Sequence, residues 1–181
     1  MSMSSFQNRI IRATKLDPNL YEEVEADKSA LGQAMAIVVL SSIAAGIGLF
    51  KTGGFNGIIT GTMASLVSWY VWAYLTYFIG TKLLPEPQTQ ADLGELLRTI
   101  GFSSSPGLLR VFYFVPGIGG ILYLISSLWM LVAMIIAVRQ ALDYNSTLRA
   151  IGVCVIGYIT QIFILLIIFS IFGGLLPKPL T

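Results

Sequence analysis

Residues 56–79 read NGIITGTMASLVSWYVWAYLTYFI and contain no Asp, Glu, Lys, Arg or His. A helix of roughly 20 predominantly apolar residues is long enough to cross the hydrocarbon core of a bilayer. The stretch is followed by Lys82 and by Pro85-Glu86-Pro87, a sequence that breaks a helix. We therefore predict a membrane-spanning helix over residues 56–79.

The composition of the whole chain also indicates a membrane protein. Of its 181 residues, 55% are hydrophobic and only 11% are charged, whereas about 25% are charged in soluble domains. The chain has no histidine, and its single cysteine, Cys154, lies in an apolar run. The sequence therefore predicts no disulfide, no metal site and no cofactor. The net charge of +2 mixes acids with bases and gives no basic surface for nucleic acid.

Four further apolar stretches flank this helix, and clusters of Gly, Pro and charged residues separate them. Together they predict an all-α fold, a polytopic transmembrane bundle of five helices with short amphipathic interfacial helices. The third span is the least apolar, because serines and Arg110 dilute it, and we expect Pro106 to kink it. The predicted spans cover residues 32–50, 56–79, 100–115, 118–138 and 151–172.

The remaining residues predict two polar ends and one surface helix. We assign residues 31–175 to the five-span domain, residues 1–30 to a cytoplasmic amphipathic and acidic helical segment, and residues 176–181 to an extracytoplasmic C-terminal tail. Leucines recur at helical spacing among charged residues, which predicts an amphipathic interfacial helix over residues 88–99.

The N-terminal segment contains a readable helix start. Asp17 can cap a helix whose first turn holds Pro18. Ahead of this start, Phe6 and Ile10 alternate with basic residues such as Arg9. The alternation predicts either a basic segment lying on an anionic leaflet or a solvated terminus.

Basic residues are distributed unequally between the two sides of the five-span bundle. Lys51 and Lys178 fall on one side, and Arg110 lies within a span. Because cytoplasmic loops carry the excess of Lys and Arg, we predict a cytoplasmic N-terminus in the plasma membrane of a prokaryote, or in Golgi or endoplasmic-reticulum membranes if the source is eukaryotic. The eight bases on the cytoplasmic side are Arg9, Arg12, Lys15, Lys28, Lys82, Arg98, Arg139 and Arg149.

Arg110 is the centre of a candidate intramembrane polar site. An ion inside a membrane is costly and often functional, but Arg110 lies near the end of its span and could also extend its head group to the interface. No span contains Asp or Glu, which argues against proton-coupled transport. The predicted polar site comprises Arg110, Gln161, Ser103, Ser104 and Ser105.

Small residues at four-residue steps predict close helix packing, either within the bundle or between two copies of the chain in a homo-oligomer. The predicted packing residues are Ser42, Gly46, Gly57, Gly61 and Ser65. The acidic cluster of the N-terminal segment is either a contact for a partner protein or a solvated helix start. This cluster comprises Glu22, Glu23, Glu25 and Asp27.

The serines of residues 101–107 do not predict a hydrolase. A serine nucleophile needs a base, and the chain has no histidine and no lysine within a predicted span. These serines can instead bond back to helix carbonyls. We therefore predict no catalytic residue and no enzymatic activity.

Several short signals occur in order along the chain: the stretch of residues 9–27, Gly101-Phe102 with Pro106, the turn of residues 116–120, and Trp129 followed by residues 139–142. These signals resemble the Yip-domain family of Ypt/Rab-interacting-protein-like membrane proteins, in its prokaryotic form. The resemblance covers nearly the whole chain and implies a five-span membrane fold. Eukaryotic members are Golgi and endoplasmic-reticulum proteins that bind Rab-type GTPases, and they carry a longer cytoplasmic N-terminal region. Here about thirty residues precede the first span, a departure that argues against GTPase binding by this chain.

Three functional hypotheses follow. The first is a non-enzymatic membrane scaffold or adaptor that binds other membrane proteins, or is accessory to a transport or trafficking complex. The second is a channel or small-molecule transporter, with Arg110, Gln161 and residues 103–105 along a polar path. The third is lipid handling or membrane shaping.

Overall fold

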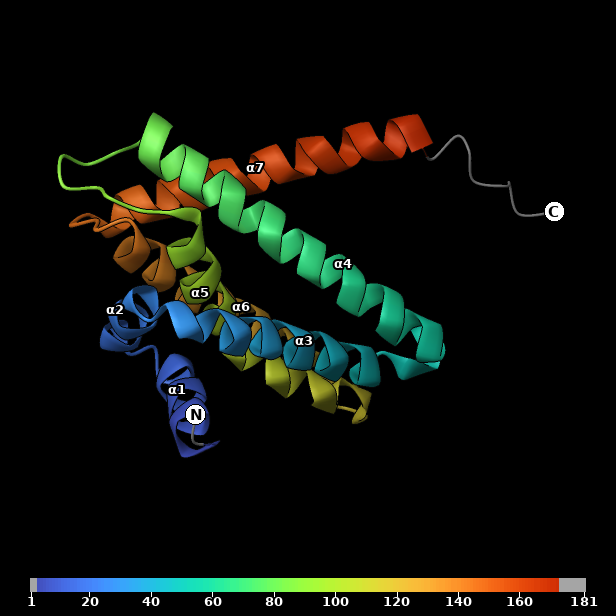
Figure 1. Ribbon diagram of the computed structural model, residues 1–181. Coiled ribbons are helices and arrows are strands. Elements are labelled where there is room, and N and C mark those ends of the chain that lie inside the picture. Colours follow the sequence, from blue (N-terminus) through green and yellow to red (C-terminus); the bar gives the residue numbers. More distant parts are fainter. Residues whose placement is uncertain (1–2, 173–181) are drawn as a thin grey trace.

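The computed structural model describes residues 3–172, apart from the side chains of residues 3, 4, 52, 165 and 168–172 (Figure 1). Every regular element in this range is a helix, which confirms the all-α fold. The predicted tail over residues 176–181 lies outside the described residues. The elements are α1 (Met3–Thr14), α2 (Pro18–Ala26), the 3-10 helix η1 (Lys28–Ala30), α3 (Leu31–Gly48), α4 (Phe50–Phe78), the π-helical turn η2 (Ile79–Leu83), α5 (Leu93–Ser103), the 3-10 helix η3 (Ser105–Phe114), α6 (Gly119–Ala141) and α7 (Thr147–Phe172).

Four segments of the described chain are long and apolar enough to cross a membrane. They correspond to the first, second, fourth and fifth predicted spans. Gly54 has φ of 56° and ψ of −162°, a backbone conformation open mainly to glycine, and it kinks α4 at the start of the second of these segments. The four segments are Lys28–Gly48, Gly53–Leu83, Gly119–Ala141 and Thr147–Ile164.

The predicted third span takes a different form, because the chain changes its winding at Ser104. The segment is α-helical in α5 and continues as the 3-10 helix η3, which has Pro106 in its first turn. Asp92 starts α5 with a capping box, in which its carboxylate accepts a hydrogen bond from the Glu95 N–H at 2.8 Å. The predicted separate helix over residues 88–99 is therefore wrong in extent, since residues 88–92 are not helical and residues 93–99 belong to α5.

The 3-10 winding makes the third segment longer than its residue number suggests. An α-helix rises about 1.5 Å per residue and a 3-10 helix about 2.0 Å. The 11 residues of α5 and the 10 residues of η3 therefore extend over roughly 36 Å in total. This length exceeds the hydrocarbon core of a bilayer, which is about 30 Å thick.

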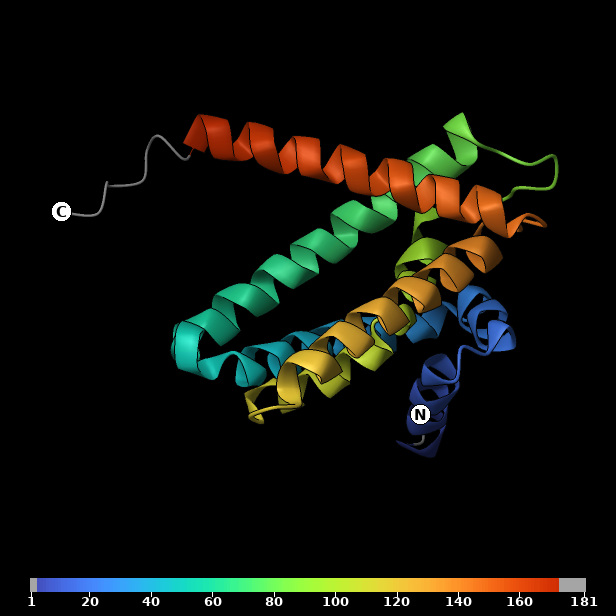
Figure 2. The same ribbon diagram turned by 180° about the vertical axis from the view of Figure 1, so that it is seen from behind.

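The α5–η3 segment follows α3 over nearly its whole length. Gly101 of α5 packs against Ala34 near the start of α3, and the Arg110 carbonyl of η3 lies against Gly48 at the end of α3. Figures 1 and 2 show that five long segments run in alternating directions between two ends of the molecule: α3, α4, α5–η3, α6 and α7. We call the end that holds α1, α2 and residues 84–92 the polar end, and the end where η3 turns into α6 the hairpin end.

Burial is concentrated toward the polar end. The large side chains that are fully buried include Tyr21 of α2, Phe102 of α5 and Val138 of α6, which belong to one apolar core. Toward the hairpin end, α4 and α6 present exposed apolar side chains, such as Met63 and Leu124. Apolar surface of this kind suits contact with lipid.

Candidate functional site

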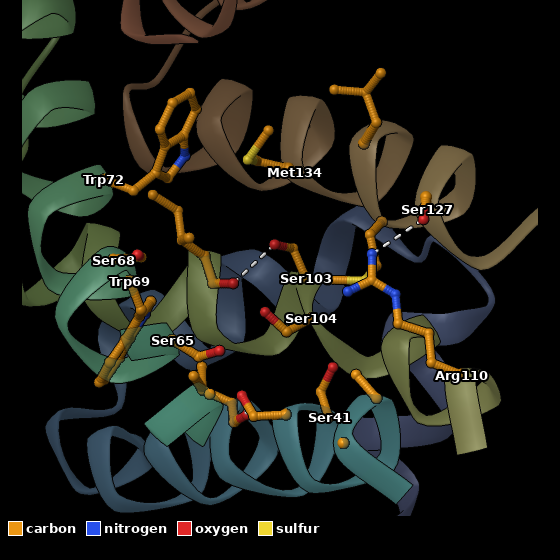
Figure 3. A pocket seen from close by; sticks show the side chains of 18 of the residues that line it. Ser41, Ser65, Ser68, Trp69, Trp72, Ser103, Ser104, Arg110, Ser127 and Met134 are labelled. Carbon is orange, nitrogen blue, oxygen red and sulfur yellow. Dashed lines mark hydrogen bonds between the residues drawn. The ribbon is translucent and has the colours of Figure 1, made fainter. Parts of the chain in front are cut away.

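A cavity of about 620 Å³ lies in the middle of the bundle, with walls from α3, α4, α5–η3, α6 and α7 (Figure 3). It contains most of the polar and small residues that the sequence singled out. Among the described residues that line it, there is no acidic side chain and one basic side chain, Arg110. The site is therefore an intramembrane hollow with a single formal charge.

Small residues form the wall of the cavity on α3 and α4. Ser42, Gly46, Gly57, Gly61 and Ser65 all line it. A Cβ atom added at Gly46 would lie 2.9 Å from the Ile58 Cγ1, so Gly46 does permit a close approach of α3 to α4. A Cβ atom at Gly57 or Gly61 would meet nothing within 4 Å. These two glycines therefore border open space instead of a neighbouring helix.

Arg110 reaches from η3 toward α6 at one side of the cavity (Figure 3). Its Nη2 donates a hydrogen bond to the Ser127 Oγ at 3.1 Å, and its guanidinium carbon lies 4.9 Å from the centre of the Tyr123 ring. The Nε–H is buried and has no hydrogen-bond partner among the described residues. The cation is thus held by a neutral hydroxyl and an aromatic face, without a carboxylate.

The remaining residues of the predicted polar site divide into two groups. Gln161, Ser103 and Ser104 line the cavity with Arg110. The Ser103 hydroxyl donates to the Ile100 carbonyl at 2.7 Å, so it offers the cavity only an acceptor. Ser105 does not line the cavity, since it is fully buried and donates to the Phe102 carbonyl at 2.7 Å.

The cavity ends toward the polar end in a floor of large aromatic and aliphatic side chains, in which the buried Trp72 Nε1–H has no hydrogen-bond partner among the described residues. Trp69, Trp72, Ile100 and Met134 form this floor, and each is at least nine-tenths buried. The Trp69 Nε1–H donates to the Leu97 carbonyl at 3.1 Å, which anchors α4 on α5. Trp72 packs on the Tyr158 ring of α7 with their centres 4.6 Å apart.

Part of this lining could have been predicted from the sequence, because the pattern of small residues on α4 continues beyond the predicted packing residues. Gly57, Gly61 and Ser65 follow one face of α4, and Ser68 and Trp72 continue the same face at helical steps of three and four residues. Continuing the pattern would have placed both in the site. Contributions from α6, such as Ser127, depend on how the helices pack and carry no such signal.

The acidic cluster of the N-terminal segment lies at the polar end and is engaged within the chain. The Arg9 Nε donates to a Glu23 carboxylate oxygen at 2.8 Å, and its Nη2 donates to Asp27 at 2.9 Å. Arg12 pairs with the same Glu23 carboxylate. Glu22 accepts a hydrogen bond from the Gln140 amide of α6 at 2.7 Å. These pairs fold α1 back onto α2 and α2 onto the bundle.

Glu25, the remaining acidic residue of this cluster, is partly buried among other acidic residues. Its Oε2 is buried and has no hydrogen-bond partner among the described residues. Burial, with the negative charges of Glu22, Asp143 and Glu95, raises the pKa of Glu25 to about 8, although Arg98 opposes the shift. The Arg98 Nε instead donates to the Val24 carbonyl at 2.9 Å, at the C-terminal end of α2.

The loop of residues 84–92 is fastened to the link between α6 and α7. The Tyr144 hydroxyl donates to the Leu84 carbonyl at 2.6 Å, and the Asn145 N–H donates to Glu86 at 2.9 Å. This backbone hydrogen bond lowers the pKa of Glu86.

The described parts of the chain hold no group of three His, Cys, Asp or Glu side chains that could bind a metal ion.

The fold and the cavity together define an integral membrane protein of the polytopic all-α class. The apolar helices belong in lipid, and the polar side chains between them converge on one intramembrane hollow. The sequence profile of the Yip1 domain matches residues 17–176, so the chain belongs to the Yip1 domain family. Comparison with curated proteins and with solved structures finds no match.

Proposed function

We propose that this Yip1-domain protein is a non-enzymatic membrane protein that binds a lipid-like amphiphile in its intramembrane cavity. The observation that supports this function is the cavity itself. Its volume of about 620 Å³ falls within the roughly 300–1,000 Å³ of small-molecule sites. An amphiphile suits a wall that carries Arg110 and serine oxygens toward one end and the tryptophan floor at the other.

The cavity is accessible from its surroundings. Tyr158 and Leu131, which line it, are 46% and 36% exposed. In Figures 1 and 2, α7 diverges from α4 and α6 as it runs away from the polar end. An amphiphile would therefore enter sideways from the bilayer, between these helices.

The structure offers less support for the two other hypotheses. A scaffold that recruits partners through its acidic cluster would need free and accessible carboxylates, whereas Glu23 and Asp27 are paired with Arg9 and the unpaired Glu25 oxygen is buried. A channel would need a continuous polar path, whereas the lining ends at the buried floor around Trp72 and Met134.

The membrane placement that goes with this function has five crossings and a cytoplasmic polar end. The eight bases counted on the cytoplasmic side of the sequence belong to elements of the polar end, while Lys51 lies near the turn into α4 at the hairpin end. Cytoplasmic regions carry the excess of Lys and Arg. We favour a prokaryotic plasma membrane for this arrangement.

Filling the cavity tests the proposed function. The full-length protein is purified from native membranes in mild detergent, and the lipids that remain bound are quantified by mass spectrometry. Gly61→Leu places an apolar side chain in the open space that Gly61 borders. We expect retained lipid to fall by roughly tenfold, the effect of about 1.4 kcal/mol of binding free energy.

Met63→Leu is the matched control, because Met63 is on α4, is 62% exposed and does not line the cavity. This variant should retain as much lipid as the wild-type protein. Equal retention by Gly61→Leu and Met63→Leu, or no bound lipid in the wild-type protein, would contradict the proposed function.

A further inference from the structure

We infer that Arg110 makes the cavity selective for a phospholipid with an anionic headgroup, whose phosphate pairs with the guanidinium. This inference rests on the proposed function and specifies its ligand. A neutral lipid would fill the same hollow without an anion for the guanidinium. A zwitterionic phospholipid would offer the same phosphate but would bring a cation of its own, so the net positive charge of the site would remain.

The hydrogen bonding of Arg110 shows that the guanidinium has unused donors. A guanidinium carries five N–H donors in a planar fork. One of them bonds to Ser127, and the buried Nε–H has no partner. Planar, bidentate binding of a phosphate or carboxylate is the geometry that an arginine fork favours.

The chain itself supplies no anion to this position. None of the lining residues that the structure describes is Asp or Glu, and every Asp and Glu of the sequence lies outside the predicted spans. An unpaired charge inside a membrane protein is costly, and such charges are normally paired. An anionic ligand provides the missing partner.

The rest of the cavity matches the remainder of a phospholipid. Ser41, Ser65 and Ser104 line the wall between Arg110 and the floor, where their hydroxyls can contact glycerol and ester oxygens. Met130 and Trp72 provide apolar surface for the first part of an acyl chain. A free phosphate ion would use Arg110 but not this apolar part of the lining.

A competition between two headgroups tests the inference. The full-length protein is reconstituted in vesicles with equal amounts of phosphatidylglycerol and phosphatidylcholine, and then re-extracted in mild detergent. The ratio of the two retained lipids is measured by mass spectrometry. We expect the wild-type protein to enrich phosphatidylglycerol by roughly tenfold, because both lipids offer a phosphate to the guanidinium but only phosphatidylcholine adds an ammonium group that the guanidinium repels.

Arg110→Gln should retain the two lipids in nearly equal amounts, and Arg110→Lys should show an intermediate ratio because it keeps the charge and loses the fork. Lys51→Gln is the matched control, since Lys51 is an exposed base near the same end and does not line the cavity. Millimolar inorganic phosphate should not change the wild-type ratio, because the acyl chains contribute to binding.

The outcomes separate the two proposals. Lipid bound without a headgroup preference, or a preference that survives in Arg110→Gln, would overturn the inference and leave the proposed function standing. Absence of any bound lipid would overturn the proposed function as well. Displacement of phosphatidylglycerol by free phosphate would show that the site recognises the anion alone and would contradict a lipid ligand.

Discussion

Glu25 is the residue whose charge state should be most visible in the stability of the protein. Its pKa is raised to about 8 by burial and by the neighbouring acids Glu22, Glu95 and Asp143. A carboxyl group with a raised pKa in the folded state stabilises the fold at low pH. This contribution is fully present below the ordinary pKa of about 4.3 and is lost as the pH rises through about 8.

We predict that thermal unfolding in detergent shows a loss of stability as the pH rises from about 4 to about 8, and that Glu25→Gln removes most of this loss. Since Glu25 is only partly buried, the gain at pH 9 should be on the order of 1 kcal/mol. The loss at low pH should persist, because Arg12 lowers the pKa of Asp17, and Ser29 with Arg9 lowers that of Asp27. A Glu25→Gln protein whose stability falls over the same pH range, and by as much, as that of the wild-type protein would disprove this prediction.

At the scale of single elements, two adjacent glycines at the hairpin between η3 and α6 should respond differently to the same substitution. A Cβ atom at Gly119 would lie 2.7 Å from the Tyr113 carbonyl carbon, a backbone atom that cannot rotate away. A Cβ atom at Gly120 would meet nothing within 4 Å. The chain therefore supplies its own matched control.

Gly119→Ala should destabilise the protein by about 1–3 kcal/mol, as overpacking typically does. Gly120→Ala should be neutral or should stabilise α6 by up to about 1 kcal/mol, because alanine favours a helix over glycine. Thermal unfolding of both variants in one detergent measures the difference. Equal unfolding midpoints for the two variants would show that the hairpin is loosely packed at Gly119.

Sequence patterns predicted the α-helical elements better than the winding of η3. The apolar stretch of residues 56–79 and its flanking Gly54 and Pro85 place the second span to within a few residues. Pro106 predicted a bend, but no local pattern specified ten residues of 3-10 helix. That winding accompanies the contacts of Gly107 with Ser41 and of Gly48 with the Arg110 carbonyl, which are long-range.

The sequence predicted those residues of the candidate site that are polar and lie within apolar stretches. Arg110, Gln161 and Ser103 are polar residues in apolar surroundings, and the sequence alone singles them out. Gly57 and Gly61 were expected to pack against a helix, because small residues at this spacing usually do so. Their position beside a cavity follows from the angle at which α4 leaves α3 (Figure 1), which the spacing does not determine.

At the scale of the whole molecule, the number of crossings decides which loops share a side of the membrane. If α5–η3 crosses, Lys51 and Pro116 lie outside, and Gln88 and Asn145 lie in the cytoplasm. Single cysteines at these positions, in a Cys154→Ser background, can be labelled in intact cells with a membrane-impermeant maleimide.

We predict that the cysteines at positions 51 and 116 react in intact cells and that those at 88 and 145 react only after lysis. Lys51 and Gln88 precede the α5–η3 segment, so they calibrate the assay under either topology. Reaction at position 145 but not at 116 in intact cells would mean four crossings, with both termini on one side.

The tighter winding of η3 also determines where along the bundle axis its cation sits. The same ten residues wound as an α-helix would be about 5 Å shorter. The Pro106 carbonyl already accepts a hydrogen bond from the Ser126 hydroxyl of α6 at 2.9 Å, so the start of η3 is anchored. Rewinding η3 as an α-helix from this fixed point would move Arg110 along the bundle axis toward the polar end. The depth of the Arg110 charge in the bilayer therefore depends on the pitch of η3.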